Sequence, residues 1–295
     1  MPVVPYPKGS VGSTRADRAS SLNRNSSNLK STIRTRASAA KQRLLRLGRK
    51  IYWFGQSRFC TVCQSNISTF LPAGNPLRAN AICPVCYSVE RHRMIWAFLS
   101  ARLSRPDLHG FRLLHVAPEY GLRSNLQKID GVDYWTSSLN GAGTRVSADI
   151  TNLSFDSDFF DGILCSHGLE HVLDDRSAMK EFFRVLRPMG WAVLQVPLEL
   201  DREFTYEDAT IASSADRMKA FGNESHVRVY GRDYPERLRS TGFNASLIGC
   251  EEILPGGVLR HGMDPGEPLC YCTKPPRFPA DPARFSSRSS AANPA

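Results

Sequence analysis

The chain has 295 residues, and its 41% hydrophobic content suits one folded domain with a sizeable core plus attachments. No apolar run approaches the roughly 18 residues that cross a bilayer, so we do not expect a transmembrane protein. The formal net charge of +10 is unevenly placed, because residues 1–50 carry twelve Lys or Arg and one acid, while the other residues are nearly neutral. A nearly neutral remainder argues against a broad nucleic-acid channel.

Residues 1–50 form a basic tail that is rich in Ser, Asn and Arg and poor in aromatic residues. Such a segment buries too little apolar surface to offset chain entropy, and we expect it to be disordered. From Ala37 to Phe54 the sequence becomes weakly amphipathic, which predicts a solvated basic helix; binding of this stretch to an anionic membrane or to nucleic acid is the alternative. An acid-poor, Arg-rich start also resembles an organelle transit peptide, but three prolines among the first seven residues oppose a helix there. A cytoplasmic location is therefore expected, with an organellar one as the alternative.

Four cysteines follow as two short pairs, Cys60-x-x-Cys63 and Cys83-Pro-Val-Cys86. Two pairs at this separation are typical of a zinc ribbon, in which four thiolates bind one Zn²⁺ at about 2.3 Å. With four protein ligands the ion has no open position, so the predicted role is structural. The alternative is a set of buried or disulfide-linked thiols. The other cysteines are scattered and no secretory signal is recognised, which favours reduced thiols.

The run from Arg91 to Leu99 has helical periodicity that ends near Arg105-Pro106. We therefore predict that residues 51–105 form a zinc-ribbon-like module with a connecting helix. His92 is a candidate fifth metal ligand. Because four thiolates already satisfy the ion, a helix cap or salt link is the expected role of His92.

From residue 111 onward short apolar runs alternate with helical patterns. The predicted strands are 111–117, 132–137, 145–148, 159–165, 191–196, 244–248 and 269–273, and the predicted helices are 121–129, 176–186 and 234–241. This alternation predicts an α/β domain over residues 106–274, with a parallel sheet covered on both faces. Ligands of such sheets bind beyond the carboxyl ends of the strands. The end of the chain, residues 275–295, is rich in Pro, Ser, Ala and Arg and is expected to be flexible.

Two segments of this domain carry a family resemblance. The first reads Phe-Asp-Gly-Ile-Leu-Cys-Ser-His-Gly-Leu-Glu-His over residues 160–171, and the second reads Arg-Val-Leu-Arg-Pro-Met-Gly over residues 184–190. Over about residues 111–250 the chain resembles the type-11 group of class I S-adenosylmethionine-dependent methyltransferases, including members with a preceding four-cysteine ribbon. The resemblance implies S-adenosyl-L-methionine as the cofactor, bound across the first four strand ends. It also implies a Rossmann-like, seven-stranded, mostly parallel sheet with one reversed edge strand.

The resemblance further implies which residues hold the cofactor. The loop after the first strand is glycine-rich in the family; here it contains His115, Ala117, Glu119 and Gly121, of which only Gly121 keeps the pattern. Ser138 stands where the family has an acid for the ribose hydroxyls, and Glu119 is the alternative source of that carboxylate.

Residues after the third and fourth strands complete the implied cofactor site. Asp149 and Ile150 match the segment that meets the adenine amino group and ring, although an Asp at this kind of position commonly caps a turn instead. Ser166 and His167 follow the fourth strand and are expected to line the floor of the pocket.

A sulfonium methyl group is already activated, so orientation of the acceptor is the main catalytic need. A base is needed only for an acceptor hydroxyl or amine. His226 and His171 are the candidate bases, with bracing of a helix start as the alternative for His171. Arg228 and Tyr230 are candidates for contact with an anionic or sugar acceptor. The favoured function is methyl transfer to a small molecule or glycan, and the alternatives are a catalytically silent binding module and an RNA or protein methyltransferase.

Overall fold

The structure of the chain is a computed structural model that describes residues 40–74 and 76–277. The chain divides into two compact units, Met1–Trp53 and Phe54–Ala295. In the first unit residues 40–52 are helical, within the stretch for which the sequence predicts a basic amphipathic helix. The tail predicted to be disordered covers residues 1–50, and residues 40–50 of it are helical instead. Residues 1–39 of this tail, and residues 278–295 of the end predicted to be flexible, lie outside the described residues.

Two small antiparallel hairpins open the second unit. β1 (Arg58–Cys60) pairs with β2 (Ser65–Ile67), and β3 (Leu71–Ala73) pairs with β4 (Arg78–Ile82). The first cysteine pair spans the turn between β1 and β2, and the second follows β4. Strands this short are not stable alone. Their small core is made by Ile67, Phe70 and Val85, which are at most 2% exposed.

Helix α2 (Glu90–Arg102) joins these hairpins to the sheet. Met94, Ile95 and Leu99 on this helix are at most 1% exposed, so its apolar side is fully covered. The His92 ring accepts a hydrogen bond from the Val89 backbone nitrogen at 3.4 Å. The prediction that His92 caps the helix is confirmed.

The second unit is built on a seven-stranded sheet. In spatial order its strands are β12 (Asn244–Ile248), β13 (Leu269–Thr273), β9 (Leu186–Gln195), β8 (Phe160–Ser166), β5 (Phe111–Val116), β6 (Val132–Ser138) and β7 (Val146–Ser147). The strands from β5 to β9 pair in parallel, whereas β13 is antiparallel to both of its neighbours. The mostly parallel seven-stranded sheet is thus confirmed.

The prediction that the reversed strand lies at the edge is wrong. β12 occupies the edge, and β13 lies between β12 and β9. The crossover from β9 through α6 (Tyr234–Arg239) places β12 parallel to β9 but one position away from it. The chain then returns through the short helices α7 (Cys250–Ile253) and α8 (Val258–His261), and β13 fills the vacant position in the opposite direction.

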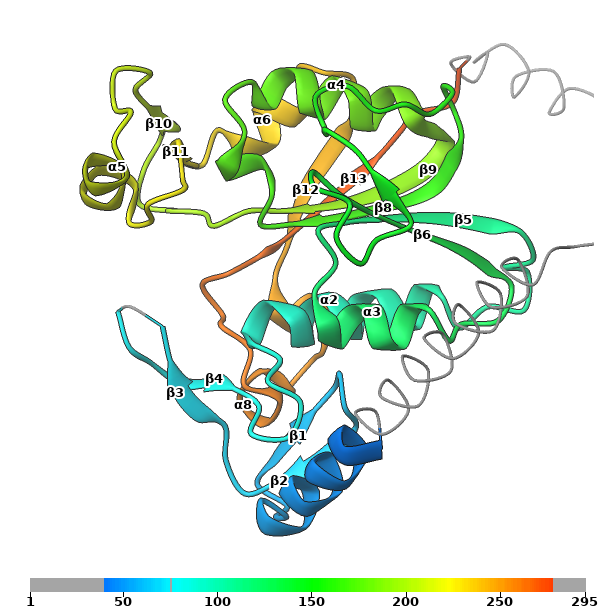
Figure 1. Ribbon diagram of the computed structural model, residues 1–295, viewed down its shortest axis with the longest axis vertical. Coiled ribbons are helices and arrows are strands. Elements are labelled where there is room, and N and C mark those ends of the chain that lie inside the picture. The colour runs from blue at the N-terminus through cyan, green and yellow to red at the C-terminus, as the bar shows by residue number, and fades with distance from the viewer. Residues whose placement is uncertain (1–39, 75, 278–295) are drawn as a thin grey trace, which may run out of the picture. The chain divides into compact units, whose positions relative to one another are not determined.

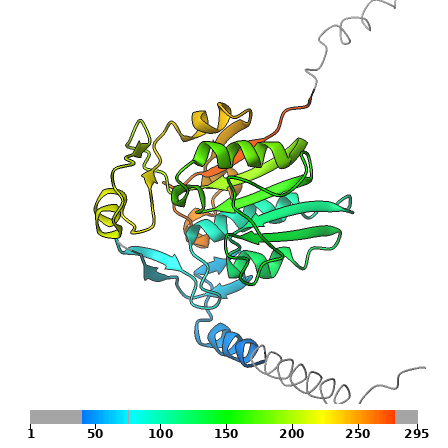
Figure 2. The ribbon, with the colours of Figure 1, turned by 45° about the horizontal axis from the view of Figure 1, so that its top comes forward.

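Helices cover both faces of the sheet. α2 and α3 (Tyr120–Leu126) lie on one face, while α4 (Asp175–Val185) and α6 lie on the other (Figures 1 and 2). Central strands buried on both faces need continuous apolar runs rather than alternation. Leu113 and Leu114 on β5 and Ile163 and Leu164 on β8 meet this need, since all four are 0% exposed.

The chain enters β9 earlier than the sequence predicts. Helix α4 ends at Val185, and β9 begins at the next residue instead of at Trp191. The intervening Pro-Met-Gly is absorbed as an irregularity, because the pairing register with β8 shifts between Phe160 and Gly162 and Met189 has a φ of 64°.

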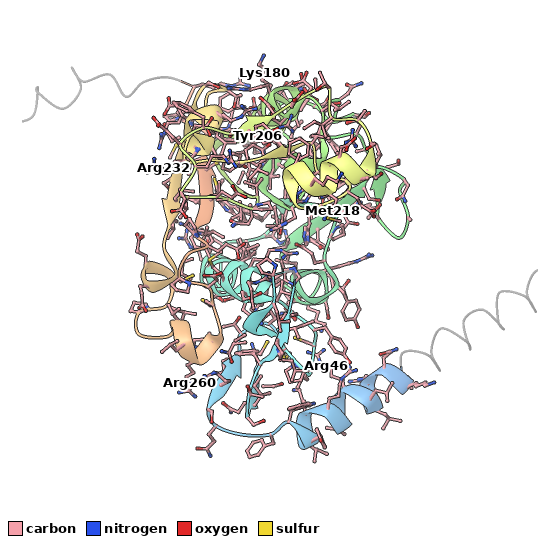
Figure 3. The ribbon with its side chains drawn as sticks, turned by 90° about the vertical axis from the view of Figure 1, so that its left-hand side faces the viewer. Arg46, Lys180, Tyr206, Met218, Arg232 and Arg260 are labelled. Carbon is pink, nitrogen blue, oxygen red and sulfur yellow. The ribbon has the colours of Figure 1, made fainter. Side chains whose placement is uncertain are left out.

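Between β9 and α6 runs a polar segment that contains β10 (Tyr206–Glu207), α5 (Ser214–Phe221) and β11 (Arg228–Val229), with β10 antiparallel to β11. Figure 3 labels Tyr206 and Met218 on this segment, and Arg260 on α8, which packs against β1. The His261 ring at the end of α8 lies 3.0 Å from the Phe59 carbonyl oxygen. Among the described residues, no helix has the length and apolar character needed to cross a membrane.

Candidate functional site

The four cysteine sulfurs of the hairpins come together in one cluster. Cys60, Cys63 and Cys83 are at most 6% exposed, and all four Sγ atoms lie within 4.8 Å of one another. The Sγ atoms of Cys60 and Cys86 are 3.7 Å apart, and those of Cys63 and Cys83 are 3.8 Å apart. A tetrahedral site with Zn–S bonds of about 2.3 Å has edges of about 3.8 Å, whereas a disulfide brings two sulfurs to about 2.05 Å. The cluster therefore has the dimensions of a four-thiolate metal site.

Local backbone geometry aims the thiols at one point. The residues directly after the two pairs, Gln64 and Tyr87, have φ values of 50° and 61°, so the chain turns sharply there. The Ser88 hydroxyl lies 3.3 Å from the Cys60 sulfur and 3.2 Å from the Cys86 sulfur. Hydrogen bonds of this kind around a ligand set orient the ligands and tune their charge.

Arg93 fastens the ribbon to the rest of the unit. This side chain is 0% exposed, and its guanidinium stacks 4.0 Å from the Phe70 ring centroid. Its guanidinium donates five hydrogen bonds to backbone carbonyls in three segments of the chain. The acceptors are Asn80 (3.0 Å) and Ala81 (3.1 Å), then Ser88 (2.8 Å), then His261 (2.7 Å) and Gly262. This role of Arg93 was not predicted from the sequence, although Arg93 lies in the run Arg91-His92-Arg93 at the start of α2.

The ribbon also contacts the helix that follows the first strand of the sheet. The Asn125 side-chain amide donates to the Val62 carbonyl at 2.7 Å. A Cβ atom at Gly121 would lie 3.1 Å from Val62 Cγ1, so a glycine here lets α3 approach the first knuckle closely. Gly121, a predicted cofactor residue, thus lies against the ribbon at the start of α3.

The loop between β5 and α3 is held by a buried carboxylate. His115 is 0% exposed; its Nδ1 lies 2.8 Å from Tyr134 Oη and its Nε2 lies 2.9 Å from Glu119 Oε2. The other oxygen of Glu119 is 3.5 Å from His92 Nε2. Burial by itself would raise the pKa of Glu119, but the hydrogen bond with His115 and the nearby His92 ring outweigh it and hold that pKa well below its usual range. His115 and Glu119 therefore pin the loop to β5 and α2, while Tyr120 remains 75% exposed.

Two residues at the carboxyl ends of central strands have left-handed backbone. Ala117 after β5 has a φ of 46°, and His167 after β8 has a φ of 54°. Their backbone nitrogens donate to Ser137 and Gln195, in each case at 2.8 Å. A left-handed residue other than glycine costs roughly 1–2 kcal/mol, and such strain gathers at functional sites. Both positions lie at the same edge of the sheet.

Ser138 stands where the family has an acid for the ribose, and its hydroxyl is hydrogen-bonded within the protein. Its hydroxyl lies 3.2 Å from both Asn140 Oδ1 and Thr144 Oγ1. The neighbouring Ser137 is 0% exposed, and its hydroxyl has no hydrogen-bond partner within the described residues. Ser137 was not predicted from the sequence, where the family resemblance points to the adjacent Ser138 instead.

Asp149 both caps a turn and keeps one oxygen free. Its Oδ1 accepts hydrogen bonds from the Thr151 backbone nitrogen at 2.9 Å and from the Thr151 hydroxyl at 2.8 Å. Asp149 is exposed, and no described residue bonds its Oδ2, so this oxygen is open to an adenine amino group. Ile150 beside it is 8% exposed and presents an apolar wall.

The end of β8 gathers the remaining predicted site residues. Glu170 lies in the one-turn helix η1 (Leu169–His171), and its Oε1 is 3.2 Å from His167 Nδ1. The rings of His171 and His226 meet edge to face with centroids 4.8 Å apart. Burial lowers the pKa of His226, and the nearby Glu170 opposes that effect. The two candidate bases, far apart in sequence, are thus neighbours.

Buried polar atoms without hydrogen-bond partners concentrate at this edge of the sheet. Among the described residues they include Ser137 Oγ, Ser166 Oγ, His167 Nε2 and both carboxylate oxygens of Glu170. Such atoms are costly to bury unpaired, and each calls for an explanation such as a ligand, ion or water. The carboxyl ends of β6 and β8 therefore have the unmet polar groups of a ligand site.

The expectation that Tyr230 contacts an acceptor is wrong, because this side chain is fully buried. Arg228 is largely buried as well, but it borders a cavity. Arg228 is 3% exposed and donates to Glu207 Oε2 at 2.9 Å, and the Tyr230 hydroxyl donates to Asp175 at 2.8 Å. Burial, followed by the charge of Asp175, raises the pKa of Tyr230. The cavity beside this network has a volume of about 370 Å³, and its lining includes side chains of both charges, among them Asp174 and Arg217.

The comparisons with known proteins bear on the same region. Residues 114–194 match a family model described as a methyltransferase domain. These residues run from β5 to β9 and so include every strand end discussed above.

Curated relatives match parts of the chain. A demethylmenaquinone methyltransferase of Clavibacter sepedonicus is 45% identical over 114 residues, which cover 34% of this chain and 46% of that protein. A chloroplastic 2-phytyl-1,4-beta-naphthoquinone methyltransferase of Arabidopsis thaliana is 33% identical over 75 residues, which cover 21% of this chain and 29% of that protein. The chain spans less than half the length of these relatives.

Among solved structures, the 1,6-didemethyltoxoflavin-N1-methyltransferase of Burkholderia thailandensis, with bound 1,6-didemethyltoxoflavin and S-adenosylhomocysteine, is similar over 62% of this chain and 78% of its own. The identity is 16% and the TM-score is 0.41. A likeness at this level adds nothing to the fold described above.

Proposed function

We propose that this chain, whose residues 114–194 match a methyltransferase domain, is an S-adenosylmethionine-dependent methyltransferase that transfers a methyl group to a small polar acceptor. The observation that carries the proposal is the arrangement at the carboxyl ends of β5, β6 and β8. Strained backbone at Ala117 and His167 and unpaired buried polar atoms meet there, within the matched residues. Ligands of open parallel sheets bind at this edge.

The residues present fit S-adenosylmethionine on the adenine side. Asp149 Oδ2 would accept from the adenine amino group, and Ile150 would pack against the ring. The Ser137 hydroxyl would serve the ribose in place of an acid. The left-handed turn at Ala117 would direct backbone N–H groups of the loop toward the methionine part.

When bound, the cofactor supplies a methyl group on a positively charged sulfur. The protein then has to exclude water and hold the acceptor in line with that methyl group. His115 and Glu119 keep the loop in one conformation through their 2.9 Å contact, so the site is organised before the cofactor binds.

A small polar acceptor is favoured over an apolar one by the lining of the nearby cavity. Val227, next to His226, and Leu173, close to His171, border it together with charged side chains of both signs. The names of the curated relatives describe quinone methyltransferases. Because charged walls suit sugars or other polar molecules better than quinones, we extend only the methyl transfer to this chain.

We also propose that the cysteine cluster binds one structural Zn²⁺. The sulfur separations of 3.7 and 3.8 Å support this assignment, as does the closed set of four thiolates. Four reduced thiols also favour a cytosol-like compartment.

Calorimetric titration of the full chain with S-adenosylmethionine tests the proposed function. Asp149→Asn keeps the oxygen that caps the turn but replaces the free oxygen by an amide, which cannot accept from adenine. We expect affinity to fall about 10- to 100-fold, the equivalent of losing a hydrogen bond to a charged group. Asp156→Asn, an exposed neighbour on the following loop, is the matched control and should bind normally. Binding that is absent in the wild type would favour a silent binding module, and equal binding in Asp149→Asn would remove the adenine assignment.

A further inference from the structure

We propose that Glu170, His171 and His226 hold a divalent transition-metal cation at the carboxyl end of β8, separate from the cysteine cluster. One potential ligand atom from each of these three residues lies within 4.8 Å of the other two. Two imidazoles and one carboxylate converging from η1 and from the loop before β11 form the kind of set that binds first-row metals.

The strongest support is the state of the Glu170 carboxylate. Glu170 is 1% exposed, and neither carboxylate oxygen has a hydrogen-bond partner. His167 Nδ1 lies 3.2 Å from Oε1 but outside hydrogen-bond geometry. Burying a carboxylate without compensating bonds costs several kcal/mol, so native proteins pair such groups with cations or metals. A metal ion between Glu170 and the two histidines supplies that compensation.

The surroundings of His171 match those of a metal ligand. Its Nδ1 lies 3.2 Å from the Ser225 carbonyl oxygen, so the neutral ring that donates there leaves Nε2 with a free lone pair. Metal-bound histidines almost always donate their other N–H in this way. The Val227 backbone nitrogen donates to the Glu170 carbonyl at 2.9 Å, which holds the segment carrying His226 against η1.

The arrangement needs only a small movement to close around an ion. Ligand atoms about 2.1 Å from a tetrahedral metal are about 3.4 Å apart, compared with separations of up to 4.8 Å here. His171 is exposed, so rotation of its side chain can bring the third ligand inward without disturbing the core.

The ligand set selects the kind of ion. Ca²⁺ and Mg²⁺ prefer oxygen ligands, whereas imidazole suits Zn²⁺, Fe²⁺ and similar ions. Three protein ligands leave coordination positions open, as in catalytic rather than structural sites. If the chain transfers methyl groups as proposed above, an oxygen of the acceptor occupies one of these open positions, and the ion orients the acceptor.

Metal content and titration of the full, untagged chain test the site. After loading with Zn²⁺ and gel filtration, the wild type should hold about two ions per chain, one in each proposed site. His171→Ala and Glu170→Gln should hold about one, with affinity for the second ion reduced at least tenfold. His171→Ala changes an exposed side chain, so it should leave folding intact. His109→Ala removes another exposed histidine and is the control for adventitious binding.

Cobalt identifies which site is filled. Co²⁺ bound to thiolates shows sulfur-to-metal charge-transfer absorption, and Co²⁺ at Glu170 and the histidines does not. The second equivalent should therefore add only weak visible bands, and these should disappear in His171→Ala. A wild type that binds one ion, or variants that bind the second as tightly as the wild type, would overturn the proposal. Binding of S-adenosylmethionine is measured in a separate titration. A failure of the metal site can therefore be distinguished from a failure of the proposed function.

Discussion

Replacement of Cys83 by serine separates a metal-held ribbon from a merely buried cluster of thiols. Cys83 is 0% exposed, and its sulfur lies 3.8 Å from that of Cys63. Serine has nearly the same shape but is a poor zinc ligand at neutral pH. The substitution therefore removes one corner of the tetrahedron and leaves the surrounding packing in place.

The loss of stability should be large because the ribbon is not an independent appendage. Structural zinc contributes about 10–16 kcal/mol to the folding of zinc-finger peptides, against a total of about 5–15 kcal/mol for a typical domain. Contacts through Arg93 and Val62 tie the ribbon to α3 and to the segment after α8. If only about 5 kcal/mol is lost, the melting temperature of the unit should fall by roughly 10–20 °C, at about 2–4 °C per kcal/mol.

The assay combines elemental analysis with thermal melting, with and without a strong chelator. Wild type should contain zinc at the cysteine cluster and melt lower when chelator is added, whereas Cys83→Ser should lack this zinc and melt low in both conditions. Cys272→Ala, a buried thiol outside the cluster, is the matched control and should keep its zinc while losing about 1 kcal/mol. A Cys83→Ser protein that retains both its zinc and its melting temperature would refute the reasoning.

Three further changes probe the contacts around the site. Arg93→Met should lower the unfolding free energy by more than about 3 kcal/mol, because it leaves buried carbonyls unpaired, and an unchanged denaturation midpoint would contradict that role. Glu119→Gln should cost about 1–3 kcal/mol above pH 4.5. Because the folded-state pKa of Glu119 is lowered, the difference in unfolding free energy between wild type and variant should shrink as pH falls below 4.5. A difference that grows toward acid pH in denaturation experiments would contradict a lowered pKa. Tyr230→Phe should cost about 1.5–3 kcal/mol through loss of its bond to Asp175, measured by urea denaturation, and a neutral effect would count against that bond.

Much of the fold could be read from the sequence because its signals are local. The cysteine spacing predicts the ribbon-like module, and the apolar runs at β5 and β8 predict buried central strands. The order of the last two strands depends on where the chain inserts β13, which no local pattern encodes. The early start of β9 could not be predicted either. Pro188 and Gly190 normally interrupt a strand, but here they lie within an irregular part of it.

The site was harder to predict because it depends on contacts between distant segments. The sequence pattern identifies Glu119 as a possible ribose ligand, but the packing of α2 brings His92 to it and turns its carboxylate inward. Glu170 carried no predicted role, although it stands between Leu169 and His171 in the family-like motif, because burial without a partner is visible only in three dimensions. His171 and His226 were predicted separately, and the fold makes them one cluster.

A crystal structure of the full chain with S-adenosylhomocysteine tests the central claim most directly. The adenine should lie between Ile150 and the free oxygen of Asp149, with the amino-acid end over the turn at Ala117. A nucleoside bound elsewhere, or crystals that stay empty at saturating concentrations while the edge of β5, β6 and β8 is accessible, would contradict the account.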